Sequence, residues 1–252
     1  MQVVGYETVS KDTPSALRVA DDGVVSRVDL SPGSTLDYGL GDRHCAGVLE
    51  DDRHVACPNE ETPYCSMHTT TWPCARCTGN CTMPLEACHE EHVVYLAAFA
   101  PSTFKVGVTR TWRFDRRLRE QGADRAARIR IVPNGREARR IEANLATTLT
   151  DRVPIREKIA GLHRSVDLDA WETLLESHDV EDDIEFEYGF ELARQPVPAT
   201  LATGRVLATK GRILVLRRGG TTYAVDIRDL LGYELSEDAS MERHQSSFQA
   251  FE

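Results

Sequence analysis

All seven cysteines of this 252-residue chain lie between residues 45 and 88. The segment is rich in Pro, Thr, Asn and Gly and shows little apolar periodicity, so it does not bury a hydrophobic core of its own. Either disulfide bonds or bound metal must therefore hold it together. Disulfide bonds fit poorly, because the number of cysteines is odd and the chain has the character of an intracellular protein.

Zinc suits this segment well. With His68 added, the cysteines supply eight soft ligands, enough for two tetrahedral sites. Chain order assigns one site to Cys45, Cys57, Cys65 and His68 and the other to Cys74, Cys77, Cys81 and Cys88. Because protein side chains fill both sites, we predict a structural role for two Zn²⁺ ions rather than a catalytic one.

The pairing of the ligands stays open at this level. Neighbouring histidines are spare ligands, namely His44, His54, His89 and His92. An iron–sulfur cluster on the second four cysteines is an alternative.

Charge is divided unevenly along the chain. The formal net charge is -10, yet residues 105–140 hold twelve basic residues and only four acidic ones. A concentrated positive patch on an acidic protein is typical of surfaces that bind phosphates, although ion pairing on a helix surface is the alternative. Since four acids cannot pair twelve bases, we predict nucleic-acid contacts at Arg110, Arg113, Arg116, Arg139 and Arg140.

Lysine is rare in this chain. Of 30 basic residues, only Lys11, Lys105, Lys158 and Lys210 are lysines. Abundant acids and arginines with few lysines indicate a salt-adapted, halophilic proteome, in which overall acidity does not argue against a nucleic-acid partner. No apolar run approaches the ~18 residues of a membrane span, and no signal peptide is visible, so we expect a cytoplasmic protein without membrane association.

The middle of the chain has a recognisable order of elements. Apolar periodicity and turn residues predict strand, strand, helix, strand and helix at residues 93–99, 104–109, 113–120, 128–132 and 137–152. On the last helix, Ile141, Leu145 and Leu149 recur every four residues and mark the buried face, with Glu142 at its edge.

Two short motifs fall on the predicted hairpin: Val93-Val94-Tyr95 and Lys105-Val106-Gly107. In this order of elements they resemble the GIY-YIG nuclease superfamily, and the Lys version of the second motif is similar to its phage-type branch. The fuller pattern, with Thr109-Arg110, Arg117-Leu118 and Gln121-Gly122-Ala123, is similar to an uncharacterised family that joins cysteine clusters to such a domain. The resemblance covers about residues 45–152.

The resemblance implies a metal-dependent cut of a phosphodiester. Carried over by position, Tyr95 would assist the activation of water, Arg117 would steady the phosphate, and Glu142 would hold Mg²⁺ or Mn²⁺. Lys105 replaces the tyrosine of the second motif and completes the candidate catalytic set.

The predicted fold is α+β, in which a zinc-binding loop segment and a small GIY-YIG-like α/β domain with a three-stranded sheet are flanked by β-rich terminal segments. The predicted divisions are an N-terminal β segment, a zinc-binding segment, a GIY-YIG-like domain, a helix-plus-strand extension, a β-meander and a polar tail, at residues 1–44, 45–92, 93–152, 153–195, 196–235 and 236–252.

Three functions remain in competition. The leading hypothesis is a zinc-stabilised nucleic-acid-binding protein that hydrolyses phosphodiesters with a divalent metal. The second is a non-catalytic module that docks on DNA, on RNA or on a ribosomal particle. The third is a zinc-organised protein-interaction scaffold whose basic patch binds an acidic partner. The choice between DNA and RNA and the oligomeric state stay open.

Overall fold

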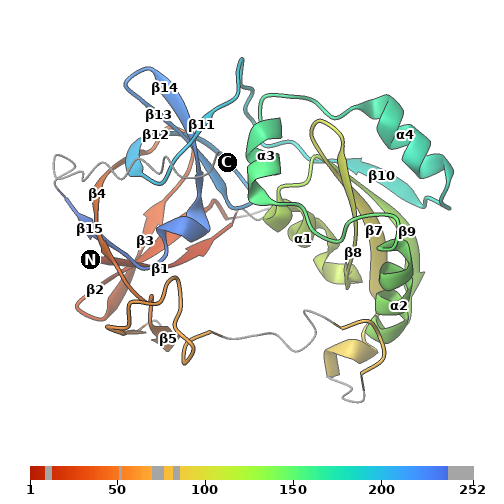
Figure 1. Ribbon diagram of the computed structural model, residues 1–252, viewed down its shortest axis with the longest axis horizontal. Helices are drawn as coiled ribbons and strands as arrows, with labels where there is room; N and C mark the ends of the chain where they lie inside the picture. The colour runs from red at the N-terminus through yellow and green to blue at the C-terminus, as the bar shows by residue number, and fades with distance from the viewer. Residues whose placement is uncertain (9–12, 51–52, 70–76, 82–85, 238–252) are drawn as a thin grey trace, which may run out of the picture.

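Strands dominate both ends of the chain, because alternating β-branched residues stand there between glycine-containing turns. The computed structural model describes residues 1–8, 13–50, 53–69, 77–81 and 86–237. Its strands form two sheets, a large one on the left of Figure 1 and a smaller one on the right.

The large sheet joins the two ends of the chain. It has eleven strands in the order β11-β14-β13-β12-β4-β15-β1-β2-β3-β6-β5. Their bounds are β1 Gln2–Glu7, β2 Ala16–Asp21, β3 Val24–Asp29, β4 Thr35–Arg43, β5 Val48–Glu50, β6 Arg53–Val55, β11 Val197–Pro198, β12 Ala202–Lys210, β13 Ile213–Arg218, β14 Thr221–Asp226 and β15 Tyr233–Ser236. The C-terminal β12 pairs with the N-terminal β4, and β15 lies between β4 and β1. The predicted terminal β segments therefore share one core, which includes Leu17, Leu36 and Leu214.

The central sheet has four strands, whereas the sequence predicted three. The order is β10-β9-β7-β8, with β7 His92–Phe99, β8 Thr103–Arg110, β9 Arg125–Val132 and β10 Asp182–Glu185. The added strand β10 belongs to the predicted helix-plus-strand extension, pairs with β9 and is only four residues long. It ends early because the Phe186 N–H bonds to the Asp124 carbonyl and Gly189 turns the chain at φ +70°.

Helices cover both faces of the central sheet. Helix α1 (Phe114–Gln121) follows the short helix η3 (Thr111–Arg113) and buries Phe114 and Leu118 against one face. Helix α2 (Gly135–Leu145) begins at Asn134, whose side chain accepts a hydrogen bond from the Glu137 N–H. It packs on the other face together with helix α4 (Leu168–Glu176), which contributes the buried Trp171.

The second predicted helix, at residues 137–152, is too long. Helix α2 ends at Leu145, and the hydroxyls of Thr147 and Thr148 bond back to carbonyls of its last turn. The chain then passes beside the free edge of β8, where the Val106 N–H donates to the Thr150 carbonyl at 3.0 Å. This hydrogen bond covers the outer edge of β8 next to Lys105.

The predicted helix-plus-strand extension at residues 153–195 contains two helices. Helix α3 (Ile155–Gly161) precedes α4, which begins where the Asp167 side chain accepts from the Ala170 N–H. Helix α3 packs Ile159 and Leu162 on Ile213 and Val215 of the large sheet, so it joins the two halves of the molecule (Figure 1).

The two sheets also meet directly through α1 and the end of β12. Gly122 closes α1 in the left-handed conformation and lies against the backbone of Lys210. The Lys210 ammonium forms an ion pair of 2.5 Å with Asp124. The remaining short helices are η2 (Glu86–His89) and η4 (Ile227–Leu230). Within the described residues, no helix combines the length and apolar character needed to cross a membrane.

Candidate metal centre and candidate catalytic site

The first four predicted zinc ligands meet in one cluster. Cys45 follows β4, Cys57 follows β6, and Cys65 and His68 lie on one tight turn. In that turn the N–H groups of His68 and Thr69 both bond to the Cys65 carbonyl. The local backbone therefore presents a thiol and an imidazole to the same point, as a spacing of three residues requires.

The spacing of the donor atoms fits zinc. The Cys45 Sγ and Cys65 Sγ atoms lie 3.3 and 3.4 Å from His68 Nδ1, and the Cys57 and Cys65 sulfurs are 4.0 Å apart. All four donor atoms lie within 4.8 Å of one another. A tetrahedral ion with Zn–S bonds of about 2.3 Å sets its sulfurs about 3.8 Å apart. The cluster can therefore hold a metal ion such as zinc in a closed site.

The surroundings of one thiol in this cluster favour its thiolate form. Burial raises the pKa of the Cys65 thiol, but hydrogen bonds with the His68 and Met67 backbone and with the neighbouring thiols outweigh it and lower that pKa. The pKa of the Cys57 thiol is shifted upward instead. The Cys45 backbone is held by Asn59 and by the side chain of Gln2 on β1. The metal centre thus belongs to the large sheet.

The second predicted set of ligands lies elsewhere. Cys74 falls outside the described residues, and within the described part of the chain only the first set forms a metal-competent group. The segment with Cys77 and Cys81 lies on α2, where Arg136 donates to the Cys81 carbonyl at 2.8 Å. Gly79, at φ +83°, fits against the backbone of the same helix. The segment predicted as one zinc-binding unit is therefore divided between the two sheets.

Tyr95 lies at the centre of the candidate catalytic site. Its side chain is 1% exposed, stacks edge-on against Phe114, and lies across Gly107 of the neighbouring strand. Its hydroxyl accepts a hydrogen bond from Gln121 at 2.9 Å. Burial raises the pKa of Tyr95, so the phenol keeps its proton, and the charge of Arg117 acts in the opposite direction.

Lys105 lies on the same face of the sheet. It pairs with Ala97, two positions beyond Tyr95, and is buried beside the segment at Thr150. Burial, together with the positive charge of Arg117, lowers the pKa of Lys105 to about 8, although the negative charge of Glu142 acts in the opposite direction. A buried lysine with such a pKa is part neutral near physiological pH.

Arg117 and Glu142 approach this pair from different helices. Arg117, on α1, is 46% exposed at its side chain and contacts Glu120 at 3.5 Å. Glu142, on α2, is 14% exposed at its side chain and forms a 2.7 Å ion pair with Arg139. The charges of Arg117 and Glu142 both reach the buried side chains of Tyr95 and Lys105.

A basic hollow of about 380 Å³ lies at the end of the β7–β8 hairpin away from its turn, beside His92 and Arg110. Its arginines are Arg110, Arg113, Arg117, Arg136 and Arg139. Three of them belong to the predicted nucleic-acid contacts, whereas Arg116 and Arg140 do not line the hollow. Its other polar residues are Cys77, Cys88, His92 and Thr109.

Arg136 was not singled out from the sequence. In the sequence it is one of the twelve basic residues at 105–140 and nothing more. Only the packing of residues 77–81 on α2 distinguishes it from its neighbours.

A family model described as "Protein of unknown function (DUF2797)" matches residues 56–235. This range begins just before Cys57, includes the central sheet, and ends at Leu235 on β15. No curated protein and no solved structure matches the chain.

Proposed function

The chain belongs to the family described as protein of unknown function DUF2797, and we propose that it is a zinc-stabilised nucleic-acid-binding protein with a GIY-YIG-like, metal-dependent nuclease centre. The family description assigns no activity, so the proposal rests on the residues of this chain. The observation that carries it is the convergence of Arg117 and Glu142 on the buried pair Tyr95 and Lys105.

The order of elements supports this proposal. Strands β7 and β8 form the hairpin that carries both motifs, α1 follows with Arg117, and β9 lies on the other side of β7. Helix α2 then follows with Glu142, whose charge reaches Tyr95 and Lys105. This order agrees with the one that the resemblance to GIY-YIG nucleases implies, with β10 as an added edge strand.

The chemistry required is the attack of water on a phosphodiester phosphorus. We assign Lys105 the role of base, because its pKa near 8 allows its neutral amine to accept the proton that the attacking water loses. As the new P–O bond forms, the bond to the leaving oxygen breaks. Arg117, exposed at the mouth of the site, stabilises the negative charge that collects on the phosphate oxygens.

Glu142 is the residue that would hold a divalent cation. One of its oxygens accepts from Arg139, which leaves the other for a metal that also takes phosphate oxygens and waters. When bound, Mg²⁺ or Mn²⁺ would neutralise charge on the reacting phosphate. A single carboxylate suits magnesium, which keeps several waters in its shell.

The basic hollow supplies the surface for a nucleic-acid backbone. Five arginines line it, and it adjoins the candidate catalytic residues through Arg117. Phosphate contacts of this kind give affinity that does not depend on base sequence and falls with salt.

We also propose a second structural zinc in the segment that contains Cys77, Cys81 and Cys88. This segment packs on α2, which carries Glu142, so ordering it would help to position the wall of the basic hollow. Cys74 remains the predicted fourth ligand.

Cleavage assays test the enzymatic part. Purified protein is incubated with labelled single- and double-stranded DNA and RNA, with Mg²⁺ or Mn²⁺ or with neither. Glu142→Gln is compared with Glu137→Gln, a change of an exposed carboxylate on the same helix. Metal-dependent cleavage that only Glu142→Gln abolishes is the expected result and also identifies the substrate.

A second candidate function is a docking module without catalysis. The observation in its favour is the Arg139–Glu142 ion pair, which already neutralises the only carboxylate proposed for the metal. Salt-sensitive binding to one nucleic acid, with no cleavage in any metal, would replace the nuclease by this function. The absence of salt-dependent binding would favour the protein-interaction scaffold instead.

A further inference from the structure

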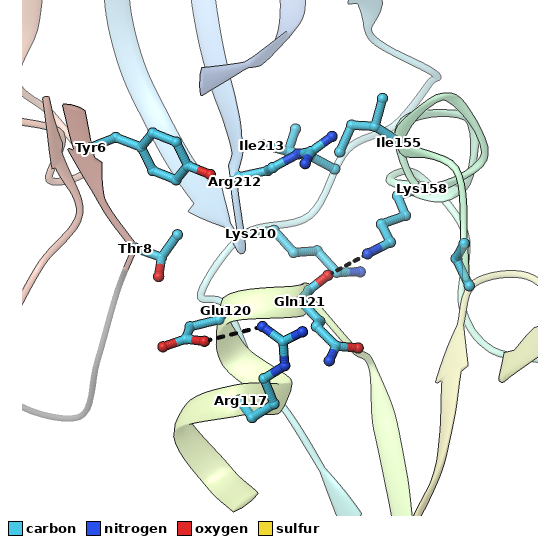
Figure 2. A pocket seen from close by; sticks show the side chains of 11 residues that line it. Tyr6, Thr8, Arg117, Glu120, Gln121, Ile155, Lys158, Lys210, Arg212 and Ile213 are labelled. Atoms are coloured by element: carbon cyan, nitrogen blue, oxygen red, sulfur yellow. Dashed lines mark hydrogen bonds and ion pairs between the residues drawn. The ribbon is translucent and has the colours of Figure 1, made fainter. Parts of the chain in front are cut away.

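A second hollow lies between the two sheets and shares Arg117 with the basic hollow. It encloses about 330 Å³ and is bounded by β1, the end of β12, helix α1 and helix α3 (Figure 2). Four cationic side chains face it from three regions of the chain: Arg117, Lys158, Lys210 and Arg212. This convergence is invisible in the sequence, because more than ninety residues separate Arg117 from Lys210.

Negative charge at this hollow is scarce. The only acidic residue in its lining is Glu120, which already contacts Arg113, Arg116 and Arg117. Lys210 is paired with Asp124, which lies outside the lining. Arg212 is paired in the same way with the buried Asp226.

Lys158 differs from the other three cations. Its ammonium donates to the Gln121 carbonyl at 2.8 Å and lies 4.4 Å from the centre of the Phe99 ring. Within the described residues it has no carboxylate partner. A neutral carbonyl and a ring face do not neutralise the positive charge of an ammonium group that has lost part of its water.

The charges around Lys158 increase this deficit. Burial lowers the pKa of Lys158 to about 7, and the nearby cations Lys105, Arg212, Arg117 and Lys210 all act in the same direction. An anion in the hollow would counteract this effect and raise the pKa of Lys158, because it would lie among all four of the cations that line the hollow.

We propose that this hollow binds a phosphate group carrying two negative charges. Guanidinium groups of Arg117 and Arg212 match pairs of phosphate oxygens, and the ammonium groups of Lys158 and Lys210 add further positive charge. Tyr6 and Thr8 contribute hydroxyl donors to the lining, and burial raises the pKa of Tyr6, which keeps it a donor. The volume is in the range of small-ligand sites, about 300–1,000 Å³, so a nucleotide as well as free phosphate has room.

This assignment does not require that the protein cut nucleic acid. It shares Arg117 with the candidate catalytic site, but Lys158, Lys210 and Arg212 do not line the basic hollow. The phosphate has two possible sources, a free phosphate compound or the terminal phosphate of a polynucleotide, and the chemistry of recognition is the same for both.

Calorimetric titration of the full-length protein with inorganic phosphate tests the proposal, with chloride at equal ionic strength as the reference. We expect saturable binding of one phosphate per chain and at least a tenfold weakening in Lys158→Gln. Arg156→Gln removes an exposed charge from the same helix α3, outside the hollow, and should leave the affinity unchanged. Tyr6→Phe, which removes only one hydroxyl, should weaken binding several-fold and serves if Lys158→Gln does not fold.

The lack of saturable binding to the wild-type protein would overturn the proposal. Equal affinities in wild type, Lys158→Gln and Tyr6→Phe would also overturn it, because the phosphate would then bind elsewhere. Titration with a nucleoside 5′-monophosphate and with an oligonucleotide, with and without a 5′-phosphate, identifies the source. A preference for the phosphorylated end that Lys158→Gln removes assigns the hollow to a polynucleotide terminus, and its absence assigns the hollow to free phosphate compounds.

Discussion

The ring of Tyr95 lies flat against the backbone of Gly107 on the neighbouring strand. A Cβ atom built on Gly107 would lie 2.6 Å from the Tyr95 hydroxyl oxygen and from the adjacent ring carbon. The two residues are direct partners in the β7–β8 register. The glycine of the second motif therefore makes room for the tyrosine of the first, and it does so at a position where the ring is fully buried.

Gly107→Ala should destabilise the protein and displace Tyr95. The added methyl overlaps a buried ring that Phe114 and Gln121 hold in place, and overpacking of this kind costs roughly 1–3 kcal/mol. Urea denaturation measures the change in the free energy of unfolding. Gly5→Ala, where the nearest side-chain atom is 3.4 Å from the new Cβ, is the control and should change stability less. Equal effects in both variants would contradict the packing described for Tyr95.

Removal of zinc should destabilise the large sheet. Cys65→Ser removes a ligand from the closed cluster with Cys45, Cys57 and His68, so the variant should lose one equivalent of zinc by elemental analysis and unfold at lower temperature. Cys88→Ser tests the second zinc separately. We expect two equivalents in the wild type and one in each variant, and one equivalent in both wild type and Cys88→Ser would rule out the second site.

The stability of the fold should depend on the protonation of Lys158. Its pKa is about 7 in the folded protein and near 10.5 when unfolded, so between these values the unfolded chain holds more protons. Stability therefore rises with pH over this window, by at most about 1.4 kcal/mol per pH unit, and below it the full penalty of the buried charge is present.

Lys158→Met should remove this part of the pH dependence. In phosphate-free buffer the variant should gain most over the wild type at pH 7 and below, and the gain should shrink by pH 9. Urea denaturation at each pH measures the difference between the two proteins. A gain that stays constant with pH would contradict the burial of a charged Lys158.

The proposed base predicts the pH profile of cleavage. If Lys105 accepts the proton from water, the rate rises with pH and levels off above about 8, because only the neutral amine can act. Lys105→Arg keeps the charge but removes the base, and the rate should fall about 10²- to 10⁴-fold. Binding of substrate to Lys105→Arg, measured without metal, should be preserved. Full activity in this variant would exclude the role of Lys105 as the base.

The basic hollow predicts a salt-dependent affinity for nucleic acid. Arg113→Gln removes a charge from its lining and should weaken binding uniformly across sequences, lowering the slope of log affinity against log salt by about 1. Arg130→Gln removes an exposed arginine on β9, outside the hollow, and should change neither quantity. Equal slopes in all three proteins would place the nucleic-acid surface elsewhere.

The local pattern of apolar and turn residues in the sequence determined several helices and strands of this protein. The apolar run at residues 93–99 and the turn after it define the β7–β8 hairpin, and the spacing of Phe114 and Leu118 defines the buried face of α1. The strand-rich α+β class was predicted from such periodicity. The metal-competent cluster was predicted from ligand type and order alone, because the Cys65–His68 spacing suffices to form half of it.

Contacts between distant segments decided the rest. The added strand β10 pairs with β9 across more than fifty residues, and helix α2 stops at Leu145 because the chain beyond it pairs with β8. The gathering of Lys158, Lys210 and Arg212 beside Arg117 depends on how α3 seats on the large sheet. Periodicity reports which face of an element is buried, but it carries no information on which distant element covers that face, and so only the tertiary structure could place these charges together.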